Sequence, residues 1–373
     1  MSYLESFTIS RAIAFLMVIG LLSSCTSQDI SGERKYMPAA NGQTGDIVVV
    51  MDSLKWAGPV GDLLRDIFTA PVQGLPQDEP QFKLRHVDPR KMTKLIKQSR
   101  NLMYVTLLDD ESRSGRLLKN SFPKEAKQKI KDNPSLFMLP RDDEFAKGQK
   151  LIHLFGATNQ TLIDNLQKNR NRLLTYMHNS ENDRVKEEVY SGKEKVALSK
   201  RISERHEFAL RIPATYELAD EQEDFVWLRN LETEIDKSVF VSYINYTSQD
   251  VFEEENVLKL RESITSKYLR DIEKPEKYIT YQPIFPIKTE KFTFNGNFAV
   301  KGRGLWRVND NSLGGPYICY VFVDEALNRL YYVEGFVAAP GKDKKELIRE
   351  LEIILSTFKT KEQLESKTDD EKT

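Results

Sequence analysis

The hydrophobic pattern in the first half of the chain switches repeatedly between the period of a strand and the period of a helix. Residues 46–51, DIVVVM, form a β-branched run between turn residues, and residues 54–68 then place apolar side chains at helical spacing. Further strands are expected at 81–87, 101–108 and 149–156, and a long amphipathic helix at 158–178. This alternation predicts an α/β domain over residues 46–180, with one sheet packed with helices.

Strand pairs dominate the second half of the chain. The stretch EKFTFNGNFAVKGRGLWRV breaks at Asn295-Gly296, a dipeptide that strongly favours a tight hairpin, and residues 317–339 contain a second strand, turn and strand. Apolar residues recur every three or four positions in a closing helix at 343–358. With its helices collected on one side, this half is expected to be an α+β domain over residues 206–358, an antiparallel-rich α/β sandwich. A helix rich in Lys and Glu at 181–205 is expected to connect the two domains.

The start of the chain is organised like a secretory signal. Arg11 precedes an apolar run from Ala12 to Leu22, and the small residues Ser-Ser then lead to Cys25. The run is shorter than the roughly 20 residues that a bilayer span requires. Leucine, two small residues and cysteine form the pattern of a bacterial lipoprotein signal; the alternative is an ordinary signal peptide with an incidental cysteine. We expect residues 1–24 to be the signal peptide and Cys25 to carry the lipid anchor.

Two polar segments flank the part of the chain that is expected to fold. Residues 25–45 are largely polar and contain Gly, Ser and Pro, and residues 359–373 are highly charged. Both lack the apolar residues needed to offset the entropy of ordering, so we expect a flexible tether and a disordered tail. Lipidation of Cys25 would leave Cys319 as the single thiol, and no internal disulfide is expected.

Composition and motifs argue against several classes of function. Charged residues make up 30% of the chain and the net charge is −1, so no basic excess indicates a nucleic-acid partner. The sequence contains no HExxH, GxxxxGK[ST], GxSxG or CxxC motif, and none of its 4 histidines lies three or four residues from another. We therefore expect no cofactor and no metal. The KGRG segment at 301–304 is best explained by a bulge or a close backbone contact within a strand.

Three places in the sequence are candidate binding sites. Asp52 and Ser53 follow the first predicted strand, where open α/β sheets often bind ligands, and Trp56 lies one turn further on. The alternative is that Asp52 or Ser53 only caps the next helix. The segment LPQDEP places Asp78 and Glu79 between Pro76 and Pro80, in a rigid loop that either meets a partner or is simply solvated.

Adjacent carboxylates on an extended chain point to opposite sides, so Asp78 and Glu79 are not expected to converge on one atom. The third place is the pair Trp227 and Trp306, each in a predicted strand. These rings belong either to the core or to an exposed recognition surface. The acidic run Glu253-Glu254-Glu255 is read as a solvated helix start, which the helix dipole favours.

Several stretches resemble a known family. GLPQDEPQF, FVWLR, GGPYICYVFVD and RLYYVEGFVAAPGKDKKELIRELE, together with the lipoprotein signal, are similar to an uncharacterised family of Bacteroidetes envelope lipoproteins, classed as a domain of unknown function. The resemblance covers roughly residues 45–358 and implies an address in the cell envelope, without an activity. In the order of its elements, the second half also resembles the fold shared by Mog1 and photosystem II subunit P, which bears on fold and not on function.

These observations favour a lipid-anchored envelope protein without enzymatic activity, a binding or assembly module for another envelope protein, a peptide or a glycan. One alternative is a hydrolase using carboxylates such as Asp52 or Glu79; another is a carrier of an apolar ligand. Because Thr26 rather than an aspartate follows Cys25, we expect placement in the outer membrane facing the periplasm, with surface exposure as the alternative.

Overall fold

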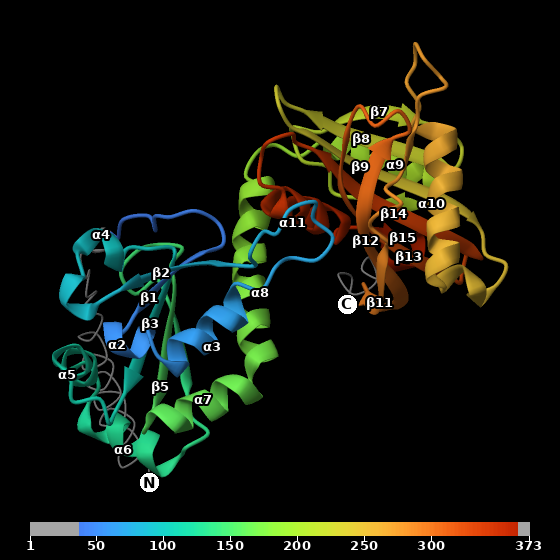
Figure 1. The fold of residues 1–373 in the computed structure, drawn as a ribbon. Coiled ribbons are helices and arrows are strands. Elements are labelled where there is room, and N and C mark those ends of the chain that lie inside the picture. The colour runs from blue at the N-terminus through green and yellow to red at the C-terminus, as the bar shows by residue number, and fades with distance from the viewer. Residues whose placement is uncertain (1–36, 365–373) are drawn as a thin grey trace, which may run out of the picture. The chain divides into compact units, whose positions relative to one another are not determined.

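A computed structural model describes residues 37–364, and the described residues from Ala39 onward belong to one compact unit. Two main sheets organise this unit, one of five strands and one of eight, and a short two-stranded sheet accompanies them. Each main sheet is covered by helices (Figure 1). The expected fold class, α/β followed by an antiparallel-rich α+β arrangement, is confirmed.

The five-stranded sheet has the order β2-β1-β3-β5-β4. Its first four strands in that order are parallel, and β4 runs antiparallel to β5. The strands are β1 (Asp46–Val50), β2 (Lys83–Val87), β3 (Asn101–Leu107), β4 (Met138–Asp142) and β5 (Lys150–Gly156). The four strands predicted from the sequence thus form the parallel part of the sheet. The fifth strand, β4, was not predicted and lies at the edge.

Helices cover both faces of this sheet (Figure 1). One face packs on α3 (Pro59–Phe68), α7 (Asn159–Lys168) and α8 (Arg170–Val189). The other face packs on α4 (Lys94–Lys97) and α5 (Arg113–Asn120). The remaining helical segments are α2 (Ser53–Trp56), η1 (Pro89–Lys91) and α6 (Lys124–Asp132). The long helix expected at 158–178 is divided, because Asn169 ends α7 and α8 begins at the next residue.

The eight-stranded sheet is antiparallel throughout and has the order β10-β12-β13-β14-β9-β8-β7, with β11 also paired to β12. Its strands are β7 (Glu217–Glu221), β8 (Phe225–Leu231), β9 (Asp236–Asn245), β10 (Ile279–Tyr281), β11 (Lys288–Phe294), β12 (Asn297–Val308), β13 (Gly314–Asp324) and β14 (Arg329–Ala338). Asn295 and Gly296 both have positive φ, as a two-residue hairpin between β11 and β12 requires.

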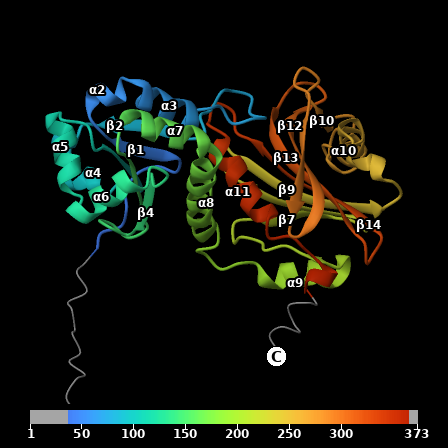
Figure 2. The ribbon, with the colours of Figure 1, turned by 90° about the horizontal axis from the view of Figure 1, so that it is seen from below.

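The helices of this half lie on both faces of the sheet, not on one side as the sequence pattern suggested. Figure 2 shows α11 (Lys345–Leu355) and α10 (Glu254–Tyr268) on opposite sides of the strands. Successive side chains of β13 point to opposite faces of the sheet, and both faces are apolar. Tyr320 packs in the hydrophobic core that includes α11, whereas Cys319 packs in the hydrophobic core that includes α10. A sheet with two buried faces needs a helix on each. The other helical segments of this half are α9 (Val196–His206) and the short η2 (Gln249–Phe252).

The described ends of the two flanking segments, residues 37–45 and 359–364, pair with the folded part of the chain. Within the expected tether, the backbone N–H of Ala40 donates to the carbonyl of Lys147 and that of Asn41 to Gln98, both at 2.9 Å. Within the expected tail, β15 (Lys359–Thr360) pairs with β6 (Phe208–Ala209). Backbone pairing with distant segments holds these residues, and composition does not reveal such pairing. Cys25 and residues 365–373 lie outside the described residues.

The KGRG segment lies inside β12, where its glycines permit close contacts. A Cβ on Gly302 would come within 2.7 Å of the Cys319 sulfur, and one on Gly304 within 2.7 Å of the Tyr317 hydroxyl. The close backbone contact expected within a strand is therefore what the structure contains. Burial raises the pKa of the Cys319 thiol to about 12, so this thiol stays protonated and unreactive.

An ion pair between α10 and β14 is fully buried. Arg261 donates from Nε and Nη2 to the Glu334 carboxylate, both at 2.8 Å, and its guanidinium lies 4.0 Å from the centre of the Tyr317 ring. We predict that Arg261→Met lowers the free energy of unfolding by about 3–5 kcal/mol, because Glu334 is left buried without its cation. Urea unfolding measures this. Lys259→Met, at an exposed pair on the same helix, is the control and should change little; equal effects would contradict the role of the buried pair.

His178 on α8 makes stability depend on pH. Burial, helped by the charge of Arg349, lowers the pKa of His178 to about 4. The folded protein therefore keeps His178 neutral while the unfolded chain protonates it below about pH 6.5. We predict that this contribution is fully present above pH 6.5 and is lost as the pH falls toward 4, by at most about 3 kcal/mol. Urea unfolding at pH 7 and pH 5 should show a smaller difference for His178→Gln than for the wild type; an unchanged difference would refute the assignment.

Candidate functional site

The carboxyl edge of the parallel strands was the first predicted site, and its polar groups are engaged within the protein. The Asp52 carboxylate accepts hydrogen bonds from the backbone N–H groups of Leu54 and Lys55, at 2.9 and 3.2 Å, and so caps α2. Ser53 Oγ donates to Asp88 Oδ2 at 3.0 Å. Asp52 therefore takes the capping role that the sequence offered as the alternative.

Asp88, at the end of β2, is the centre of this edge and was not among the predicted site residues. Its carboxylate accepts hydrogen bonds from the Arg90 backbone and guanidinium, from Ser53 and from Ser114. The Arg90 guanidinium holds the pKa of Asp88 well below its usual range. Trp56 stacks on His86, with ring centres 5.1 Å apart, and the Arg65 guanidinium lies over it at 4.5 Å. This edge is a saturated hydrogen-bond network.

The loop at 74–82 contacts α11 through one of its two acidic residues. Asp78 is exposed, whereas Glu79 is only 6% exposed. The Glu79 carboxylate accepts hydrogen bonds from the backbone N–H groups of Lys344 and Lys345, at 2.7 and 2.9 Å, and the Pro80 carbonyl accepts one from Lys345 Nζ. Glu79 thus satisfies the free amides at the start of α11. The loop is not simply solvated.

The two predicted tryptophans differ in burial. Trp306 is 3% exposed and its Nε1 donates to the carbonyl of Val337 at 3.2 Å, so it belongs to the core rather than to an exposed recognition surface. Trp227 is half-buried, and its indole N–H has no hydrogen-bond partner among the described residues. Pro76 and Trp306 line the same small pocket of about 390 Å³, together with Lys344.

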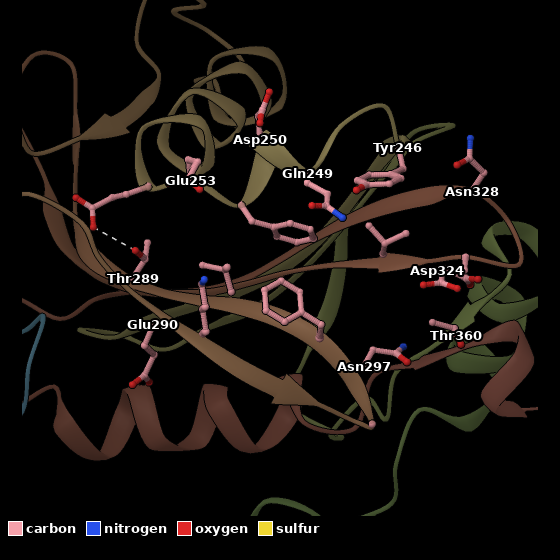
Figure 3. Close-up of a pocket in the computed structure, with 18 of the residues that line it drawn as sticks. Tyr246, Gln249, Asp250, Glu253, Thr289, Glu290, Asn297, Asp324, Asn328 and Thr360 are labelled. Carbon is pink, nitrogen blue, oxygen red and sulfur yellow. Dashed lines mark hydrogen bonds between the residues drawn. The ribbon is translucent and has the colours of Figure 1, made fainter.

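A larger groove lies at the end of the eight-stranded sheet, and no candidate residue from the sequence lies in it. We call it the acidic groove: it has a volume of about 1320 Å³ and lies between η2, the start of α10, the β11–β12 hairpin and the β13–β14 turn (Figure 3). Seven of its lining residues are acidic and one, Lys291, is basic. Within the described part of the chain, one of the seven, Glu290, forms an ion pair, with Lys301 at 3.3 Å. The others are Asp250, Glu253, Glu254, Asp324, Glu325 and Glu362.

Aromatic side chains form the floor of the acidic groove. Phe252 and Phe298 contact each other edge to face, with ring centres 5.0 Å apart, and Tyr246 also lines the groove. Phe298 is 51% exposed, so its ring is accessible to a ligand in the groove. The Glu253-Glu254-Glu255 run was the one sequence signal here, since the first two residues line the groove and α10 starts at Glu254.

Among the described residues, no three His, Cys, Asp or Glu side chains are grouped so as to hold a metal ion. None of the described helices combines the length and apolar character that crossing a membrane requires. The acidic groove, with its unpaired carboxylates and exposed ring, is therefore our candidate functional site, and it is suited to binding a positively charged ligand.

Glu79 and Asp78 offer a matched test of the loop contact. We predict that Glu79→Ala lowers the free energy of unfolding by about 1–2 kcal/mol, because two amides at the start of α11 lose their acceptor. Asp78→Ala removes the same group from an exposed neighbour and should stay within about 0.5 kcal/mol of the wild type. Urea unfolding of both variants decides the matter, and indistinguishable curves would show that the contact is not stabilising.

Comparison with known proteins identifies two regions of the chain. Residues 40–190 match a family model described as a domain of unknown function (DUF8532), and residues 195–357 match another (DUF4837). No curated protein matches the chain.

Two solved structures are distantly similar to part of the chain. The Saccharomyces cerevisiae Ran-binding protein Mog1p is 7% identical, with 42% of this chain and 90% of that chain covered and a TM-score of 0.28. Human StAR-related lipid transfer protein 5 is 9% identical, with coverages of 49% and 95% and a TM-score of 0.22. The two family models together thus match most of residues 40–357, each as a domain of unknown function.

Proposed function

We propose that this protein is a bacterial envelope lipoprotein, of the kind found in Bacteroidetes, that acts as a non-enzymatic binding or assembly module. Cys25 carries its lipid anchor, in the outer membrane with the folded part facing the periplasm. The sequence of residues 12–25 supports the anchor. The acidic groove carries the binding role, because it is wide and because six of its seven acidic residues form no ion pair within the described chain.

The two alternative functions, a hydrolase and a carrier of an apolar ligand, receive less support from the structure. The Asp52 and Glu79 carboxylates were the candidates for a hydrolase. Each caps a helix, and its oxygens already accept hydrogen bonds from backbone N–H groups, so neither is poised to take a proton from a substrate. An apolar cargo would need an apolar cavity, whereas the groove is acidic. Recognition of another envelope component fits an open, charged surface better.

We predict that a photo-crosslinking amino acid placed at Phe298 captures one reproducible envelope component in living cells. The same amino acid at Leu231, which is exposed at the end of β8 and outside the groove, should not capture it. Cys25→Ala should abolish the crosslink by removing the anchor. Mass spectrometry identifies the product. If position 298 gives no product in the anchored protein, the binding role through this groove is wrong.

A further inference from the structure

We propose that the acidic groove binds a basic segment of a polypeptide partner, with Asp324 as the anchor for a lysine or arginine side chain. This inference rests on the binding role proposed above and specifies the chemical class of the ligand.

Asp324 has a buried carboxylate oxygen without a partner. The residue is 3% exposed and lies at the end of β13, at the same end of the groove as Asn328 and Thr360 in Figure 3. Its Oδ1 accepts a hydrogen bond from the backbone N–H of Leu327 at 3.2 Å, whereas its Oδ2 accepts none from the described residues. Leaving such an oxygen unsatisfied is costly. An ammonium or guanidinium group would satisfy it with a charge-assisted hydrogen bond.

The charge around Asp324 selects a cation. The groove contains seven acidic residues and one lysine, and within the described chain Lys301 is the one cation paired with any of those acids. Carboxylates gathered along a concave surface add their potentials and attract a positively charged ligand. A neutral peptide could offer the Asp324 oxygen only an uncharged donor, which forms a weaker hydrogen bond, and an acidic peptide would meet repulsion along the groove.

The aromatic floor suits the side chains that carry such charges. Phe298 is 51% exposed and contacts Phe252 edge to face. The face of an exposed phenyl ring attracts ammonium and guanidinium groups, and the long stems of lysine and arginine pack on apolar surface. One ligand can therefore contact the rings and the carboxylates together.

The dimensions of the groove favour a polypeptide over a single small ion. Its volume is about 1320 Å³, and the described chain groups no three donors around a metal position. Thr289, Glu290 and Lys291 of β11 line one wall, and among the described strands β11 pairs only with β12. Backbone groups on the other edge of β11 are thus available to an extended segment, which could add to the sheet as a further strand.

The test is fluorescence anisotropy of the full chain with a labelled 12-residue peptide that alternates lysine with serine, and with the same peptide carrying glutamate in place of lysine. We expect saturable binding of the lysine peptide that weakens with added salt, and no binding of the glutamate peptide. Asp324→Asn should raise the Kd by about tenfold, the value of one charge-assisted contact. Glu255→Gln, at an acid beside the groove that is paired with Lys259, should leave the Kd within about twofold.

Other outcomes would overturn the proposal. Absence of saturable lysine-peptide binding would exclude a basic ligand, and an unchanged Kd in Asp324→Asn would exclude the anchor. If Asp324→Asn does not fold, the exposed pair Glu253→Gln and Glu325→Gln replaces it, with the same loss expected. Competition by millimolar Ca²⁺ that persists in Asp324→Asn would show a metal site instead. A partner crosslinked at Phe298 without peptide binding would leave the binding role intact and refute only this ligand class.

Discussion

The buried pair Arg261–Glu334 is the constraint that organises the second half of the molecule. Glu334 lies on β14, between β13 and β9, and both faces of that strand are covered by helices. A carboxylate in that position is tolerated only with a matched cation, which must come from the covering helix. Arg261 meets this need with two hydrogen bonds, and it lies over the Tyr317 ring of the next strand. The position of α10 along the sheet is therefore specified by chemistry as well as by apolar packing.

That constraint also determines where the start of α10 lies. With Arg261 fixed on β14, the first turn of the helix reaches β11, where Thr289 Oγ1 donates to Glu254 at 3.1 Å (Figure 3). Glu253 and Glu254 then face the groove, at the end of the helix where the dipole favours negative charge. The buried ion pair and the acidic groove are thus linked through α10. Because Arg261 fixes how α10 lies along the sheet, it also fixes where Glu253 and Glu254 stand in the groove.

Sequence reasoning reached the parts of this structure that depend on local pattern. The β-branched run at 46–50 became β1, Asn295-Gly296 became a tight turn, and the glycines of 301–304 became close contacts inside β12. It missed β4, whose sequence MLPRD contains a proline and charges and is largely exposed, so no apolar alternation marks it. It also missed the division at Asn169, because helical spacing continues across that residue.

The acidic groove escaped prediction for a different reason. Asp324 follows a strongly apolar strand and reads as an ordinary turn residue, and its importance comes from an oxygen that folding buries without a partner. Whether a carboxylate is capped or orphaned depends on neighbours far away in the sequence. Asp88, which is saturated by Ser53, Arg90 and Ser114, shows the opposite outcome for the same residue type.

The contrast between the two acidic regions argues for function at the groove. At the carboxyl edge of the parallel strands, each carboxylate stabilises a helix start or a hydrogen-bond network. At the groove, like charges gather with few compensating cations, so they add little to stability and repel one another. A fold that saturates its acids in one region and leaves them unpaired in another carries a local energetic cost at the second. Natural proteins accept such costs at binding and catalytic sites, where a ligand supplies the missing partner.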